Sequence, residues 1–390
     1  MFFVEKQMIE RLSGNELVAL VRRVFQPKID EKNIAILVDL PDAVVGDNPD
    51  WEARRATALE WSTLLNEHAA DLDGMKTTLV LYRNAHTNNG NLPDTCWIYT
   101  GGDLPATAEC LDAAKAIPFA DVYAKYPIML VPTQFSATAP LKMAAKQYPF
   151  RAATMGGFRH DMVPALRIDY TEVNRRVNYL KNVLDKASGA DIVFSLPDGE
   201  AKLHLDLRFR SAHSSSGLLP KTGAAGNLPS GEAYIVPYEG ENEPSRTQGV
   251  MPVQFGKEIV QYRIENNKAV EVTSQGEASQ KEAALLAAEP AYGNIAELGL
   301  GVLAAFGIKP IGKVLLDEKL GMHIAFGRSE HFGGQVGPDA FSKPEAVIHI
   351  DRVYVPEMQP DVGVKVVDIV LEEGTILPLM RDGEYVVDFA

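Results

Sequence analysis

The sequence is poor in cysteine and has no long apolar run. Its 390 residues include only two cysteines, Cys96 and Cys110, without the spacing of a metal-binding pair. This argues against a disulfide framework and favours a reducing compartment. No apolar run approaches the roughly 20 residues that a membrane span needs. Residues 1–7 include an acid and no apolar signal-peptide core, so we expect no secretion signal and a cytoplasmic protein.

Basic residues are also scarce. The chain has 38 lysines and arginines against 52 acidic residues, which gives a formal net charge of -14. The charges are spread along the chain without a long block of one sign. Such a surface repels nucleic acids and anionic membranes, and we expect neither as a partner.

The first part of the chain alternates between helical and strand patterns. Ser13 and Glu16 have the capping-box spacing ahead of an apolar helical stripe. Strands are expected at 33–40, 77–82, 128–132 and 151–155, of which 151–155 is expected to be the last in this sheet, and helices at 51–70, 105–117 and 139–147. This alternation predicts an open parallel α/β sheet. No glycine-rich phosphate turn follows the first strand, so we interpret residues 1–157 as a Rossmann-like scaffold or cap domain.

Residues 158–390 have a different pattern, rich in strands and hairpins. The expected strands are 191–195, 202–209, 257–264, 269–273, 322–326, 346–354, 364–371 and 384–388, after one or two helices within 163–186. The predicted fold class is therefore α/β, with an N-terminal open parallel α/β domain followed by a β-rich α+β metal-binding domain.

An imidazole and a carboxylate stand two residues apart in the apolar run around His349 and Asp351. In a strand, residues i and i+2 point to the same face. A buried ionised carboxylate is costly unless it is paired or coordinates a metal. This pair therefore indicates a metal site, although Asp351 could also pair with Arg352.

Three further residues of the same half could complete such a site. His323 lies in another apolar run, Glu232 follows a Pro/Gly turn, and Glu297 stands among small and apolar residues. His323 alone could be a hydrogen-bonded core histidine and Glu232 a solvated turn acid, whereas the carboxylate of Glu297 would be poorly solvated without a cation. Together, these oxygen and nitrogen ligands suit a hydrolytic zinc, cobalt or manganese site.

Four ordered segments, 227–232, 294–301, 315–327 and 348–351, resemble the signature of the thermophilic metalloaminopeptidases. This is the leucyl aminopeptidase-like family of aminopeptidase T and aminopeptidase S. The resemblance implies a homodimeric hydrolase with two divalent ions, zinc, cobalt or manganese, that removes N-terminal residues from short peptides. The metal ligands that it implies are Glu232, Glu297, His323, His349 and Asp351.

The chain departs from this family seven residues after the first ligand histidine, where the family has a tyrosine. Glu330 stands there, followed by His331. A tyrosine hydroxyl can donate to an oxyanion, whereas an ionised glutamate can instead ligate metal or accept a proton. We therefore name Glu297, Glu330 and His331 as candidate catalytic residues, and Glu330 also as a candidate metal ligand. The loop around Glu330 could equally be a solvated turn.

Two other functions remain open. His323, His349 and Asp351 alone would suit mononuclear iron, as in the dihydroxypyridine ring-cleaving dioxygenases, which resemble these aminopeptidases. Glu232 and Glu297 argue against that function, because a mononuclear iron site does not need them. The third possibility is a metal-binding protein that has lost peptidase activity, and the departure at Glu330 suggests it.

Overall fold

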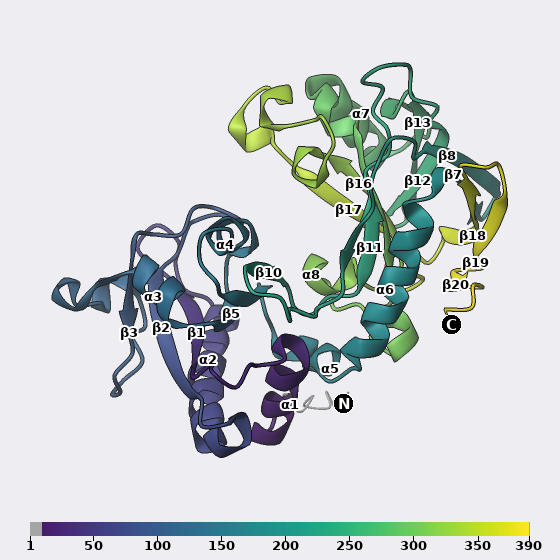
Figure 1. The fold of residues 1–390 in the computed structure, drawn as a ribbon. Helices are drawn as coiled ribbons and strands as arrows, with labels where there is room; N and C mark the ends of the chain where they lie inside the picture. The colour runs from purple at the N-terminus through teal and green to yellow at the C-terminus, as the bar shows by residue number, and fades with distance from the viewer. Residues whose placement is uncertain (1–9, 390) are drawn as a thin grey trace, which may run out of the picture. The chain divides into compact units, whose positions relative to one another are not determined.

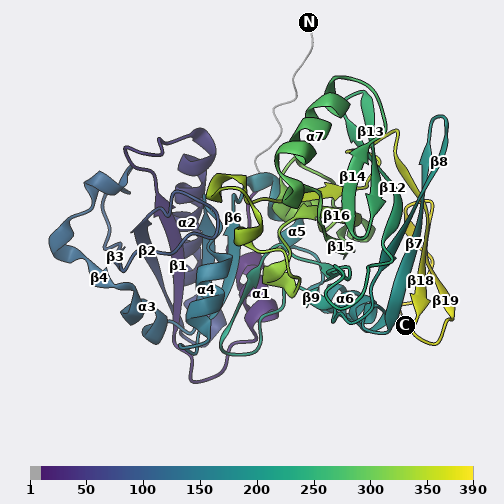
Figure 2. The ribbon, with the colours of Figure 1, turned by 90° about the horizontal axis from the view of Figure 1, so that it is seen from above.

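A computed structural model describes residues 10–389. These residues form two compact units (Figures 1 and 2). The first runs to Glu172 and also includes Gly217–Ser230, and the second comprises Val173–Ser216 and the chain from Gly231 onward. The division into domains at residue 157 stays a prediction, and segment 1–7 lies outside the described residues. Among residues 10–389, no helix combines the length and hydropathy of a membrane span.

The first unit is built on a seven-stranded sheet in the order β10-β6-β5-β1-β2-β3-β4. The strands from β10 to β2 are parallel, and β3 and β4 extend the edge in antiparallel pairing. β1 is buried along nearly its whole length, which is typical of a parallel strand covered on both faces. Helix α2 packs on β1 and β2, and α4 packs on β6 and β10 (Figure 1).

The elements of this unit are α1 (Gly14–Phe25), β1 (Asn33–Leu40), α2 (Pro49–Glu67), β2 (Lys76–Arg83), β3 (Thr95–Ile98), β4 (Ile117–Pro118), α3 (Phe119–Lys125), β5 (Ile128–Thr133), α4 (Thr138–Ala145), β6 (Arg151–Gly156), α5 (Val163–Leu166) and β10 (Ala224–Asn227). The capping box before α1 is present, since Ser13 and Glu16 bond each other's backbone N–H. The predicted α/β character of this part of the chain is confirmed.

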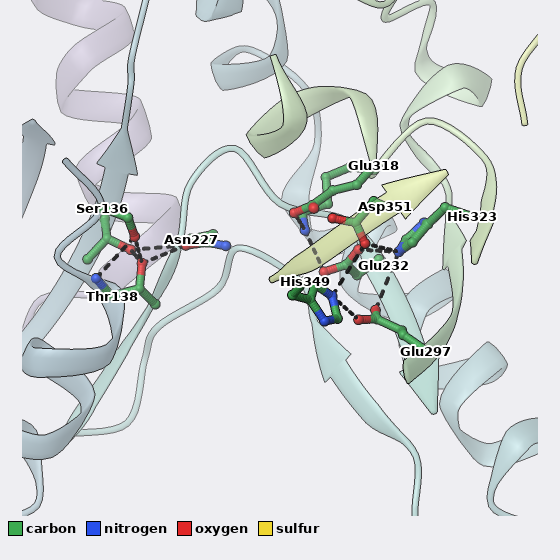
Figure 3. A network of polar contacts seen from close by, with 11 residues as sticks. Ser136, Thr138, Asn227, Glu232, Glu297, Glu318, His323, His349 and Asp351 are labelled. Carbon is green, nitrogen blue, oxygen red and sulfur yellow. Dashed lines mark hydrogen bonds and ion pairs between the residues drawn. The ribbon is translucent and has the colours of Figure 1, made fainter. Parts of the chain in front are cut away.

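Two local predictions are wrong in this unit. Residues 105–117 form two short 3-10 turns, Ala108–Cys110 and Ala113–Lys115, instead of one helix. Asp112 between them is extended, and its Oδ1 accepts a hydrogen bond from the backbone N–H of Ala114 at 3.0 Å, which starts a new turn. The sheet also continues beyond β6, because β10 pairs with it. Asn227 at the end of β10 accepts a hydrogen bond from Thr138 Oγ1 at 2.8 Å (Figure 3).

The second unit contains two antiparallel sheets. One has eight strands in the order β14-β13-β12-β8-β7-β18-β19-β20, and the other has five in the order β17-β16-β15-β11-β9. The predicted hairpin of β7 and β8 is confirmed, and helix α7 packs on β13 and β14 (Figure 2). The β-rich α+β character predicted for this part of the chain is confirmed as well.

Helix α6 (Tyr170–Leu184) runs from the first unit into the second. The other elements of the second unit are β7 (Ala187–Leu196), β8 (Gly199–Asp206), β9 (His213–Ser215), β11 (Glu232–Ile235), β12 (Gln248–Phe255), β13 (Glu258–Glu265), β14 (Lys268–Val272), α7 (Glu277–Ala288), β15 (Ile295–Gly301), α8 (Val314–Asp317), β16 (Met322–Gly327), β17 (His349–Val353), β18 (Gly363–Leu371), β19 (Ile376–Arg381) and β20 (Glu384–Tyr385).

Candidate metal centre

The five-stranded sheet carries all five residues expected as metal ligands. Four neighbouring strands contribute them: Glu232 begins β11, Glu297 lies in β15, His323 in β16, and His349 and Asp351 in β17. Residues opposite each other in an antiparallel pair share one face of the sheet. The register of the pairs places all five side chains on the same face.

Most of the residues that lie opposite these side chains on the neighbouring strands are small, and Val353, opposite His323 on β17, is the exception. The small residues include Gly301 for Glu232, Ala325 for Glu297 and Asp351, Gly299 for His323, and Gly327 for His349. A Cβ atom on Gly299 would lie 2.0 Å from the imidazole of His323. The small residues thus leave room on this face of the sheet for the large polar side chains to approach one another.

The five side chains converge as two overlapping groups (Figure 3). One consists of Glu232, Glu297 and His323 and the other of Glu297, His349 and Asp351, with the potential ligand atoms of each group within 4.8 Å of one another. Glu297 belongs to both. Its Oε1 lies 3.4 Å from His323 Nε2, and its Oε2 lies 3.2 Å from His349 Nε2. Each group therefore offers two carboxylates and one imidazole.

The donor set fits divalent metal ions. Glu232 Oε2 and His323 Nδ1 are buried and have no hydrogen-bond partner among the described residues. Buried polar atoms without partners are costly, so a cation at Glu232 would lower the free energy of the folded protein. His349 Nδ1 lies 2.8 Å from the carbonyl oxygen of Arg328 and can donate to it. That bond directs Nε2 toward the carboxylates, as is usual for histidine ligands.

Without metal, protonated histidines balance the carboxylates. Although burial opposes it, hydrogen bonds from His323 and His349 lower the pKa of Glu297 to about 2. Burial likewise opposes the charge on His323, but Glu297 and Asp351 outweigh it and raise the pKa of His323 to about 9. The pKa of His349 is raised in the same way by Asp351 and Glu297. In the metal-free protein, the charge of the protonated histidines thus takes the place of the charge that metal ions would supply.

Metal binding by the metal-free protein is therefore expected to release protons, because a histidine ligand must be neutral. Because the pKa of His323 is raised, its protonated form contributes fully to the stability of the folded protein below pH 6.5. This contribution is lost as the pH rises through about 9. Metal affinity should rise over the same interval, by up to about tenfold per pH unit for each proton released. Calorimetric titration in buffers of different ionisation enthalpy counts these protons. Binding heats that do not depend on the buffer would contradict the assignment.

Two charged residues of the cluster were not assigned a role from the sequence. Lys319 is buried, and its Nζ donates to Glu232 Oε1 at 2.5 Å and also to Glu318. Burial raises the pKa of Glu318 to about 8 against the attraction of Lys319, and the charges of Glu232 and Asp351 add to the increase. Figure 3 shows Glu318 beside Asp351. The available signal was the Asp317-Glu318-Lys319 run just ahead of the apolar strand that carries His323.

The structure does not bring Glu330 into either group of described residues. Its carboxylate is exposed and pairs with Arg328, with 2.7 Å between Arg328 Nε and Glu330 Oε2. His331 lies closer to the ligands, since its ring centroid is 5.2 Å from that of His349. His331 is also exposed, yet nearby protein atoms and the charge of His349 lower its pKa. The catalytic roles of Glu330 and His331 stay predictions.

From this geometry, Glu330→Gln is expected to leave metal content unchanged and activity within about threefold, as for most exposed ion pairs. Arg328→Gln, which removes the partner, is the matched control and should behave alike. Metal content and initial rates are the measurements. A loss of activity by about two orders of magnitude or more in Glu330→Gln alone would return this residue to the proton-transfer role.

Known proteins resemble this chain both in sequence and in fold. A search of family models finds no match. Aminopeptidase T of Thermus thermophilus is 30% identical over 228 residues, which cover 52% of this chain and 48% of that protein. Aminopeptidase T of Thermus aquaticus is 31% identical over 180 residues, or 41% of this chain and 40% of that protein. This chain is similar in sequence to aminopeptidase T over about half of its length. It matches less than half the length of these curated relatives.

Two solved structures share the fold of nearly the whole chain. Wild-type AmpT from Thermus thermophilus superposes with a TM-score of 0.52 at 18% identity, covering 96% of this chain and 99% of that one. The 2,5-dihydroxypyridine dioxygenase from Pseudomonas putida KT2440 has a TM-score of 0.58 at 15% identity, covering 97% and 99%. The resemblance to the aminopeptidase T family is confirmed, and the shared fold extends to a protein of another reaction class.

Proposed function

We propose that the chain is a metal-dependent aminopeptidase, which removes N-terminal residues from short peptides at a centre of two divalent ions. The observation that carries the proposal is the position of Glu297, whose two oxygens face different histidines in two overlapping ligand groups. A carboxylate shared in this way suits a pair of ions at close range. The similarity to aminopeptidase T supports the same function.

In this proposal some side chains bind the metal ions and others stabilise charge or transfer protons. Zinc, cobalt or manganese ions held by the two groups would polarise the scissile carbonyl and lower the pKa of water. Glu297 belongs to both groups. The backbone carbonyl of Arg328 accepts a hydrogen bond from His349 Nδ1 and so fixes the tautomer of that histidine. His331 stays neutral near pH 7 because its pKa is lowered, so its N–H can donate to the developing oxyanion. Glu297 is the carboxylate proposed for proton transfer, and Glu330, which pairs with Arg328, is not given that role.

Hydrolysis of aminoacyl and short peptide substrates with a free α-amine tests this function. We expect turnover to require cobalt, zinc or manganese, to be lost with a chelator and to return when metal is added. The N-acetylated form of the same substrate should be cleaved at least about 100-fold more slowly, since an exopeptidase uses binding to the free amine in the transition state. Equal turnover of blocked and free substrates would refute the aminopeptidase assignment.

The competing function is a mononuclear iron ring-cleaving dioxygenase, which the structural neighbour from Pseudomonas putida favours. That chemistry suits a site of two histidines and one carboxylate. Neither ligand group found among residues 10–389 includes both His323 and His349. Oxygen consumption with iron(II) and 2,5-dihydroxypyridine would separate the two enzymes. Metal binding without either activity would indicate a protein that has lost peptidase function. A homodimeric assembly and a cytoplasmic location stay predictions.

A further inference from the structure

Lys319 places a fixed positive charge inside the candidate metal centre. Its side chain is 1% exposed, and its ammonium bonds both Glu232 and Glu318. The backbone holds it there, because the carbonyl oxygen of Lys319 accepts a hydrogen bond from Leu303 N–H at 2.8 Å. Gly301 lets the two chain segments meet, since a Cβ at that position would lie 2.3 Å from the Lys319 carbonyl carbon. The backbone of Lys319 is therefore packed closely against the end of β15.

This charge acts unequally on the two ligand groups. Lys319 bonds Glu232, which belongs only to the group with His323. Among the described contacts, no hydrogen bond from Lys319 reaches Glu297, His349 or Asp351. An ion in the first group would share a carboxylate with an ammonium and be repelled by it, because like charges interact strongly where water is excluded. An ion in the second group shares no hydrogen-bonded ligand with the lysine, whose charge acts on Asp351 only through space.

We propose that Lys319 is a positioning residue that acts as an internal cation and makes the two metal sites unequal. The group of Glu297, His349 and Asp351 binds its ion first and tightly. The group of Glu232, Glu297 and His323 binds its ion second and weakly, so the second ion exchanges with the solution. This inference rests on the proposed metal centre and adds the order in which it fills.

Metal titration of the chelator-treated protein with cobalt(II) or zinc(II) tests the inference without an activity assay. For the unsubstituted protein we expect one ion per chain to survive dialysis against metal-free buffer. A second ion should bind at least about tenfold more weakly, in the range by which residues that contact ligands tune metal affinity. In Lys319→Met, whose side chain has similar length and no charge, two ions per chain should be retained. Lys309→Met, which removes an exposed lysine of the same unit, is the matched control and should leave the stoichiometry unchanged.

The outcomes separate this inference from the function on which it rests. If the unsubstituted protein retains two ions of equal affinity, Lys319 does not set their order and the inference is wrong, whether or not Lys319→Met folds. Loss of metal in a folded Lys319→Met, checked by circular dichroism, would also overturn it, since the lysine would then assist binding. If no divalent ion binds the unsubstituted protein at all, the metal-dependent function fails as well.

Discussion

Glu297→Gln is expected to weaken both metal sites and to reduce peptidase activity by at least about 100-fold. The carboxylate of Glu297 is the only ligand common to the two groups found in the described chain, and the amide that replaces it has no charge. Loss of a charged oxygen from each group weakens the attraction for both ions. Metal content per chain after dialysis and initial rates of hydrolysis are the measurements.

Two comparisons sharpen this prediction. Asp351→Asn removes a ligand from only one group, so the group of Glu297, His349 and Asp351 should lose its ion while that of Glu232, Glu297 and His323, which Asp351 reaches only through His323 at 4.0 Å, is affected less. Glu345→Gln removes an exposed carboxylate of the same unit and should change neither quantity. Full metal content with normal affinity in Glu297→Gln would show that this residue is not a ligand.

Gly299→Ala is expected to disrupt the site through the sheet itself. The added methyl group would lie 2.0 Å from the ring of His323, which is buried and cannot rotate into solvent. Overpacking of this kind costs about 1–3 kcal/mol of unfolding free energy. The imidazole must leave its position, so the ion held with Glu232 should be lost. Chemical denaturation and metal analysis measure the two effects.

Gly46→Ala provides the control for this substitution. Gly46 is exposed, its φ is not positive, and nothing lies within 4 Å of an added Cβ. An alanine there should be neutral or slightly stabilising, because it restricts the unfolded chain. If Gly299→Ala is as stable as Gly46→Ala and keeps its metal, the packing of His323 against β15 does not matter for the site.

Elements with a clear pattern among neighbouring residues could be predicted from the sequence. β1 has the predicted limits because its apolar run is continuous. Such a run is by itself typical of a parallel strand that is buried on both faces. β10 was missed because Ala224–Asn227 is short, contains glycine and has no apolar alternation. Only its pairing with β6, some seventy residues earlier, makes it a strand. Such long-range pairing is not visible in a window of neighbouring residues.

The same limit applies to the site. The spacing of His349 and Asp351 places both on one face of a strand, and that relation can be seen in the sequence. The order of β11, β15, β16 and β17 decides which side chains meet, and it follows from the whole fold. A lysine beside acids is normally a solvated surface residue, so the burial of Lys319 could not be anticipated.

The bond between His349 and the carbonyl of Arg328 links the metal centre to the loop that carries Ser329, Glu330 and His331. Glu239 holds this loop, since its carboxylate accepts a hydrogen bond from Ser329 Oγ at 2.6 Å. Any molecule that shifts Arg328 on binding would change the orientation of His349 and hence the affinity for the ion. Thermodynamic reciprocity then requires the ion to change the affinity for that molecule by the same factor. Metal binding and the position of Arg328 would then be thermodynamically coupled.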